Sequence, residues 1–430
     1  KTNPEAADAL ARCQKWLAQD RSAHDAFCAK VEKRYKAYRA VIDVRSDAAA
    51  WTSKQHPHIA LQVVETMVAN LLDPTFRWRI KARPKITDRS SWEEIALGAK
   101  SLELLLGEQV DSDRLAEKQG VFAKQALIAG LSVYKTFWDY RERRVRRQEV
   151  VSEPLMDEYG QVIATLPSTR VTDRIDVARD DPTAEVVDVR DFIWHEAAVS
   201  LDKAKRVHHR VWMSFEELKR LERDGVYKNV DQLKDVKVGG DEYSAREQDL
   251  FESSRTKDMI DVTETWYQDE DGRMKVVSIG NSAVLLRGPI DNPFGHGEYP
   301  FVVCSAMPDM FRIPGISTVE VIADLQEMIW TLMNQRIDNV RLLNNAIVLL
   351  RSDLYDMDAF EWYPGAQWPV DDPAQVKLLE VSPLPAQISL QAEELLRGDI
   401  QNTTGGMPFM SGTDTQNVDN QKETGISIFT

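Results

Sequence analysis

The longest uninterrupted amphipathic pattern in the chain lies between residues 317 and 343. Apolar side chains recur there at steps of three and four, as on one face of a helix. They are Val321, Ile322, Leu325, Met328, Ile329, Leu332, Met333, Ile337 and Val340. The opposite face carries Glu320, Asp324, Glu327, Thr331 and Asp338. Because Ser317 and Glu320 can form a capping box, we predict a rod of roughly 40 Å that begins at Ser317 and has one acidic side.

Helical periodicity also dominates the first 130 residues. We predict one or two helices over 4–42, then helices over 59–72, 92–106 and 113–129. Residues 76–85 alternate apolar and basic side chains, a pattern typical of a short strand.

After residue 132 the period changes to two, which predicts a β-rich region. A strand over 133–151 is expected to turn at 157–160 and to continue as a strand over 162–166. Further strands are predicted over 186–194, 262–267, 274–279, 283–287 and 299–305. A capped helix is predicted over 214–224, and the polar stretch 229–256 is typical of a loop or linker.

Beyond the long helix the pattern is broken. Residues 344–386 contain five prolines, many acidic residues and only short strand-like pieces. A shorter helix is predicted over 389–402, and residues 403–422 have no periodicity. The order of helices, strands and helices predicts an α+β fold.

Composition narrows the class of protein. The chain has 430 residues, 43% of them hydrophobic, and 54 basic against 69 acidic residues, a net charge of −15. Such a chain repels phosphates overall, so a DNA partner is either held by a local patch or slides past. Three cysteines without short spacing favour a reducing compartment. Since no apolar run could span a bilayer, we expect a soluble intracellular protein without a membrane partner.

Few side chains suggest a reaction. Two histidine pairs, His56 with His58 and His208 with His209, lack cysteine or carboxylate partners at zinc spacing. Nucleotide-binding loops and nucleophile motifs do not occur. We therefore predict no catalytic residue, no metal and no cofactor.

Two local features have competing interpretations. Asp180 and Asp181 could form the metal-binding pair of a nuclease, but a polar turn before Pro182 is the favoured interpretation. Cys304 follows apolar strand residues and is expected to be a buried thiol.

One dense basic patch lies in the first predicted strand, formed by Arg141, Arg143, Arg144, Arg146 and Arg147. It could bind phosphates, or it could pair with carboxylates of its own chain or of a neighbouring subunit. The acidic surplus of the chain favours the second interpretation. The acidic side of the long helix has an alternative of its own, a merely solvated face.

Six segments occur in a recognisable order along nearly the whole chain. They are VVETMVANLLDPTFRWRIKAR (63–83), ALIAGLSVYKTFWDY (126–140), DVRDFIWHEAAVSLDKAKRVHHRVWMSFEELKRLERDGVY (188–227), VTETWY (262–267), HGEYPFVV (296–303) and PGISTVEVIADLQEMIWTLMNQRIDNV (314–340). In this order they resemble the portal proteins of tailed bacteriophages, which form the ring at one capsid vertex through which DNA is packaged and ejected.

The resemblance implies a division of the chain into parts. The wing would cover 1–316, helical to residue 130 and β-rich from 131, and the first stem helix 317–343. The remaining parts would be a clip over 344–386, a second stem helix over 387–402, a tunnel loop over 403–422 and, over 423–430, the start of a further helix in a truncated chain. The family forms a ring, usually of twelve subunits, and has no catalytic activity.

The same resemblance implies roles for particular residues. The acidic side of the long helix would line the DNA channel. The tunnel loop would present Met407, Phe409, Met410 and Lys422 to the duplex. The clip would dock partners through Asp353, Asp356, Asp358 and Glu361.

The implied partners are double-stranded DNA bound without sequence specificity, the terminase motor, a head–tail adaptor, and capsid and scaffolding proteins. The implied location is the capsid vertex of the virion, after assembly in the host cytoplasm. A metal-dependent nuclease and another capsid or tail protein, such as an adaptor, remain alternative hypotheses.

Overall fold

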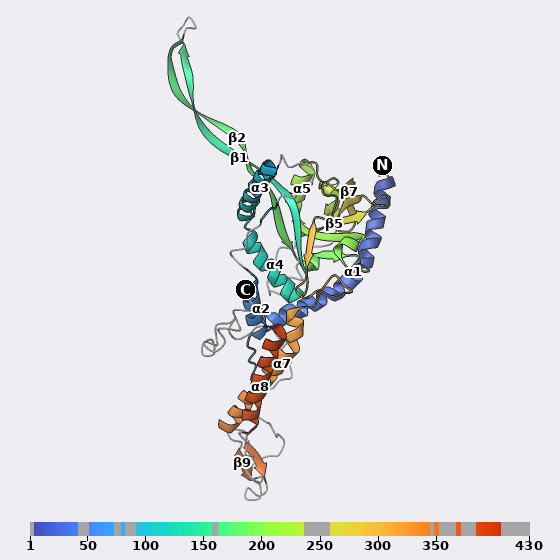
Figure 1. The fold of residues 1–430 in the computed structure, drawn as a ribbon, viewed down its shortest axis with the longest axis vertical. Coiled ribbons are helices and arrows are strands. Elements are labelled where there is room, and N and C mark those ends of the chain that lie inside the picture. Colours follow the sequence, from blue (N-terminus) through green and yellow to red (C-terminus); the bar gives the residue numbers. More distant parts are fainter. Residues whose placement is uncertain are drawn as a thin grey trace.

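The structure, a computed structural model, describes residues 4–41, 51–72, 79–81, 92–156, 162–235, 259–344, 348–351, 367–370 and 384–405. Figure 1 shows an elongated molecule in which a pair of helices leaves the central body at one end and a two-stranded hairpin leaves it at the other. The mixture of helices and antiparallel sheets confirms the α+β prediction.

The helices lie close to where periodicity predicted them. Their bounds are α1 (Pro4–Tyr38), α2 (Ile59–Leu71), α3 (Trp92–Ser112), α4 (Leu115–Ala129), α5 (Phe215–Arg223), α7 (Thr318–Asn344) and α8 (Leu384–Thr404). Residues 4–38 form one helix rather than two, and α8 begins five residues before the predicted start at 389. No helix of the described ranges combines the length and hydropathy that crossing a membrane requires.

Within the described residues, the strands form three sheets. A three-stranded sheet has the order β2 (Val162–Val187), β1 (Ser132–Met156) and β8 (Phe301–Cys304). A five-stranded antiparallel sheet contains β3 (Phe192–Trp194), β4 (Arg206–Ser214), β5 (Met259–Gln268), β6 (Met274–Gly280) and β7 (Val284–Asp291) in that order. A parallel pair joins β9 (Val348–Arg351) to β10 (Gln367–Val370).

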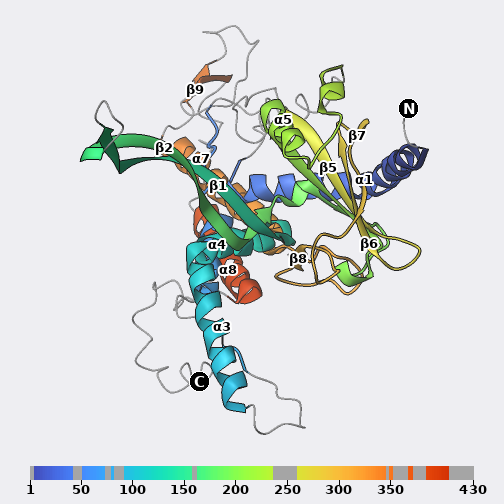
Figure 2. The same ribbon diagram turned by 90° about the horizontal axis from the view of Figure 1, so that it is seen from above.

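Strand β2 differs from its prediction. The sequence predicted strands over 162–166 and 186–194, whereas β2 runs without interruption to Val187 opposite β1. Much of the hairpin leaves the body (Figures 1 and 2). Because both of its faces meet solvent there, burial does not select alternating apolar residues, and the period-two signal is weak.

One further strand and one cysteine also differ from what the sequence predicted. Strand β4 was not predicted, because its central residues His208, His209 and Arg210 are polar yet buried. The expectation of a buried Cys304 thiol is wrong, since this residue is exposed at the end of β8. Most of the predicted strand over 76–85 and most of the loop over 229–256 lie outside the described residues.

One hydrophobic cluster joins α1 to the sheets, and another joins the body to the helix pair. Helix α1 packs Phe27 and Val31 against the five-stranded sheet, in one cluster with Phe192 and Trp266. A second cluster unites α2, α4, α7 and α8 around Val64, Leu127, Ile322, Ile329 and Ile400. The first turn of α7 is thereby buried in the body, whereas its far end leaves the body beside α8 (Figure 1).

A close backbone contact fixes the junction between body and α7. Gly130, which ends α4 with a φ of 81°, accepts a hydrogen bond from the Gly315 N–H at 2.9 Å. A Cβ on Gly130 would lie 2.5 Å from the Gly315 carbonyl oxygen, and its φ is one that side chains rarely allow. Glycine is therefore required where α4 turns into β1 beside the start of α7.

Candidate functional site

The start of α7 is anchored to two other helices. The Ser317 hydroxyl oxygen accepts from the N–H groups of Val319 and Glu320 at 3.1 and 3.3 Å, which confirms Ser317 as the predicted N-cap. The Glu320 carboxylate binds Arg34 of α1, and Arg34 also donates to the Ala129 carbonyl at 2.7 Å. Glu320 therefore ties the beginning of α7 to α1 and to the end of α4.

The extended segment 51–57 lies along α7 and is held by a row of side chains, which we call the clamp. In order along α7, Trp330 donates to Pro57 O (2.9 Å), Asn334 bonds both backbone groups of Gln55 (2.8 and 3.1 Å), Asp338 accepts from Ser53 N–H (2.7 Å), and Arg341 donates to Trp51 O (2.6 Å).

The spacing of the clamp follows from the geometry of the two elements. Four helical residues rise by about 6 Å, and two extended residues advance by about 6.6 Å. Side chains three or four apart on α7 therefore meet every second residue of the segment. Periodicity alone did not indicate this role, because it assigns the clamp residues to a face without showing what covers that face.

These contacts divide the acidic side of α7. Glu320 and Asp338 are bound within the chain, whereas Asp324, Glu327 and Thr331 are exposed. Among the residues that the structure describes, no ion-pair partner reaches Asp324 or Glu327. The assignment of this side to a DNA channel stays a prediction. In such a channel, the carboxylates of Asp324 and Glu327 would be the charges that face the DNA.

The predicted apolar face of α7 is only partly buried. Ile322 and Ile329 lie in the core, but Met328 and Val340 are exposed, as is Leu343 in the last turn. The described chain therefore leaves apolar surface uncovered on the projecting part of the helix.

Gln326 is a fully buried polar residue in the middle of α7. Its side-chain oxygen accepts from the Ala60 N–H at 2.7 Å, and its side-chain nitrogen donates to the Ala37 carbonyl at 2.9 Å. One side chain thus satisfies a donor at the start of α2 and an acceptor near the end of α1.

An ion cluster joins α7 to α8. Arg336 of α7 donates to the Glu393 carboxylate at 2.8 Å, and Arg397 of α8 binds the other oxygen at 2.9 Å. Burial alone would raise the pKa of Glu393, but the two guanidinium groups outweigh it and hold the pKa below its ordinary value. The side chains of Ile388, Leu390 and Leu395 on α8 remain exposed.

The five arginines of the basic patch lie on β1, all of them exposed. Arg141 pairs with Asp139 at 2.8 Å, and Arg146 pairs with Asp173 of β2 at 3.4 Å. Pairing within the chain thus accounts for part of the patch. Whether it also contacts phosphates or another subunit stays a prediction.

Asp180 and Asp181 are strand residues of β2, so the interpretation as a polar turn is wrong. They lie opposite Tyr140 and Asp139, and Asp180 accepts from the Trp138 indole N–H at 2.8 Å. Adjacent strand residues point to opposite faces, which does not favour a shared metal. Within the described ranges, no group of three or more His, Cys, Asp or Glu side chains could hold a metal ion.

The base of the hairpin is held by Asp113, in the turn between α3 and α4. One of its oxygens lies 2.7 Å from Lys118 Nζ, 2.5 Å from an Arg179 nitrogen and 2.5 Å from Thr183 Oγ1, and the other accepts from the Ala184 N–H. Burial would raise the pKa of Asp113, but these donors outweigh it and lower the pKa to about 2.

This low pKa predicts a dependence of stability on pH. The folded carboxyl binds a proton less tightly than the unfolded one, so its contribution is complete above about pH 5 and is lost as pH falls toward 2. The stability difference between wild type and Asp113→Asn should therefore shrink by about 1 kcal/mol from pH 5 to pH 3, measured by urea unfolding. Asp111→Asn, an exposed change in the last turn of α3, is the control measured beside it. An Asp113→Asn difference that stays constant from pH 5 to pH 3 contradicts the assignment.

A buried polar network, which the sequence did not indicate, joins α1 to the five-stranded sheet. His208 contacts Thr265 Oγ1 at 2.9 Å and Asp20 at 3.3 Å, and Arg206 binds both Asp20 oxygens at 2.6 and 2.9 Å. Burial lowers the pKa of His208 despite its contact with Asp20. Asp20 lies 188 residues from His208 in the sequence, so no local spacing could reveal the pair.

A second buried cluster lies next to this network. Lys135 of β1 donates to the Glu264 carboxylate at 2.7 Å, and His209 lies 3.3 Å from the Lys135 nitrogen. Burial would raise the pKa of Glu264, but Lys135 and His209 outweigh it and lower the pKa well below its ordinary value. The cluster joins the hairpin sheet to β4 and β5.

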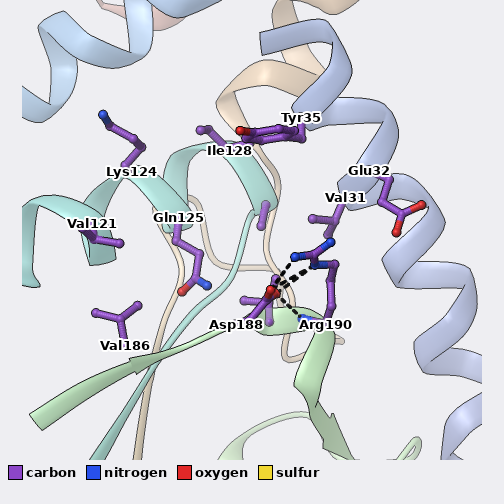
Figure 3. A pocket seen from close by; sticks show the side chains of 12 residues that line it. Val31, Glu32, Tyr35, Val121, Lys124, Gln125, Ile128, Val186, Asp188 and Arg190 are labelled. Atoms are coloured by element: carbon purple, nitrogen blue, oxygen red, sulfur yellow. Dashed lines mark hydrogen bonds and ion pairs between the residues drawn. The ribbon is translucent and has the colours of Figure 1, made fainter. Parts of the chain in front are cut away.

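A cavity of about 370 Å³ lies between α1, α4 and the end of β2 (Figure 3). Its lining is mainly apolar, with Val31 and Ile128 among its walls. Three of the charged side chains beside it are paired: both Asp188 oxygens accept from Arg190, and Lys124 binds Glu65 at 2.7 Å, while Glu32 is the fourth charged residue of the lining. The cavity therefore offers shape but no evident reactive group.

A family model described as "Phage SU10 portal protein" matches residues 120–430. The matched range contains the hairpin, both antiparallel sheets, α7 and α8. No curated protein matches the chain.

Proposed function

Because the chain belongs to the phage SU10 portal protein family, we propose that it assembles into a ring at one capsid vertex and conducts double-stranded DNA through the centre of that ring. The family is structural, and the role proposed here requires no reaction.

The uncovered apolar surface of α7 and α8 is the observation that carries the proposal. Met328, Val340 and Leu343 on α7 are exposed, and so are Leu390 and Leu395 on α8. Burying one such side chain fully contributes about 1.5–3 kcal/mol. Neighbouring copies standing side by side would cover these residues and produce a wall of helices.

The free carboxylates suit the inner side of such a wall. Asp324 and Glu327 repel phosphates, and each copy in the ring repeats them. A duplex inside would experience no strong attraction and could slide, which a conducting channel requires.

The remaining assignments rest on the family and lie largely outside the described residues. The tunnel-loop residues Met407, Phe409, Met410 and Lys422 would contact the duplex. The clip carboxylates Asp353, Asp356, Asp358 and Glu361 would dock the terminase motor and later a head–tail adaptor. The body would contact capsid and scaffolding proteins. The ring of twelve subunits belongs to the same proposal.

Electron microscopy of the purified chain tests the assembly, since rings with a central channel are expected and compact monomers would contradict the proposal.

Conduction is tested by the double variant Asp324→Lys and Glu327→Lys. Rings should still form, but added phosphate contacts should slow DNA packaging about tenfold or more. The control reverses Glu270 and Asp271, exposed in the turn between β5 and β6, and should package normally. Unchanged packaging by the stem variant would remove the channel role of these carboxylates.

A further inference from the structure

The projecting part of the hairpin, residues 138–148 of β1 with 171–182 of β2, has one exposed apolar face; we call this part the arm. The face is formed by Trp138, Tyr140, Val171, Ile175 and Val177, each between 55% and 59% exposed. Large side chains gathered on one face in this way mark an interaction surface.

A register shift brings the five side chains together. Between Arg141 and Glu142 the pairing with β2 moves by one residue, so that Glu142 lies opposite Val177 and Arg144 opposite Ile175. Without the shift, Val177 and Ile175 would lie on the opposite face from Trp138 and Tyr140, because strand residues alternate. The irregularity therefore places all five apolar side chains on one face, which they share with Glu142 and Arg144.

Helix α3 carries a second uncovered face. Leu97 and Leu104 are 69% and 70% exposed, and Leu105 is also exposed. The order along the helix is Glu94, Leu97, Leu104, Leu105 and Glu108. The steps of 3, 7, 1 and 3 residues between them place all five on one side of the helix. This side has leucines in the middle and a carboxylate at each end.

The arm and α3 have opposite net charge and similar length. The arm has seven arginines and six carboxylates, a net charge of +1, whereas α3 has five carboxylates and one lysine, a net charge of −4. The eleven residues 138–148 span about 36 Å, and the 21 residues of α3 span about 31 Å. A weakly basic ribbon with apolar side chains on one face thus matches the length of an acidic helix with exposed leucines.

One copy of the chain leaves the two faces apart. Figures 1 and 2 show the arm and α3 leaving the body in different directions. Asp113, directly after α3, holds both Arg179 and Thr183 of β2, which fixes the directions of the helix and the arm relative to each other.

We propose that the arm of one copy packs on α3 of the next copy, with its apolar face against Leu97 and Leu104. The contact uses two different surfaces of the same chain, and a contact of this kind closes into a ring when the rotation between copies permits. The inference rests on the ring assembly proposed above and adds the surface that joins the wings of adjacent copies.

Cysteine cross-linking tests the contact. In a background with Cys28→Ser and Cys304→Ser, the pair Ile175→Cys and Leu104→Cys is introduced and oxidised. We expect most of the chains to form covalent oligomers on a non-reducing gel. The matched control is Arg174→Cys with Leu104→Cys, because Arg174 is exposed on the opposite face of the arm. The control should cross-link at least about tenfold less.

Electron microscopy of the same samples separates the two proposals. Rings without the cross-link overturn the arm contact and leave the proposed function intact. Cross-linked chains without rings support the contact and contradict the ring. Samples that give neither the cross-link nor rings contradict both the arm contact and the ring proposal. A cross-link formed only to shell protein, when capsids are present, assigns the arm to a different partner and overturns the inference.

Discussion

Replacing Asp20 with alanine is expected to lower the free energy of unfolding by about 3–5 kcal/mol. The side chain of Asp20 is only 1% exposed, and it holds the Arg206 guanidinium through two short contacts and His208 through a third. Removing the carboxylate leaves the largely buried charge of Arg206 without its partner. The loss of stability is large because an unpaired charge is costly to keep away from water.

Urea unfolding followed by tryptophan fluorescence measures this loss, and hydrogen exchange should show reduced protection where α1 meets β4. The control is Asp25→Ala on the same helix. The Asp25 side chain is 64% exposed and lies 3.8 Å from Arg21, so its loss should cost less than about 1 kcal/mol. Equal losses in the two variants would show that the buried network does not hold α1 to the sheet.

The second large effect is expected from Gln326→Leu. Leucine fills a similar volume but leaves the Ala60 N–H and the Ala37 carbonyl without their partner in the core. Each orphaned group costs about 1–3 kcal/mol, so a total loss of about 2–5 kcal/mol is expected. Thermal unfolding and urea titration both measure it.

Gln335→Leu provides a matched control, because it makes the same chemical change on the exposed side of the same helix. It should change the free energy of unfolding by no more than about 0.5 kcal/mol. If Gln326→Leu is equally mild, the two hydrogen bonds do not contribute to the attachment of α7 to α1 and α2.

Local signals in the sequence predicted much of the helical structure. The apolar repeat and the cap at Ser317 located α7 to within a residue at each end, because both signals act over a single turn. Strand β2 was largely missed, because on a hairpin exposed on both faces nothing selects an apolar alternation. The extent of β2 comes from its pairing with β1.

The tertiary contacts of polar residues are the second feature that the sequence did not reveal. Gln326 looks like a surface residue in the sequence, yet its partners lie 266 and 289 residues away and remove the cost of its burial. Glu320 and Asp338 likewise belong to the predicted acidic face, but Arg34 and Ser53 engage them from far upstream. Periodicity identifies a face, and only tertiary contacts identify what covers it.

The clamp between α7 and segment 51–57 has a mechanical consequence. Its contacts form a row parallel to the helix axis, so a force along that axis loads all of them in shear at the same time. A force at right angles would peel the segment away one contact after another. The clamp is therefore strongest against axial load, and thrust along α7 passes through segment 51–57 into α2 and the rest of the body.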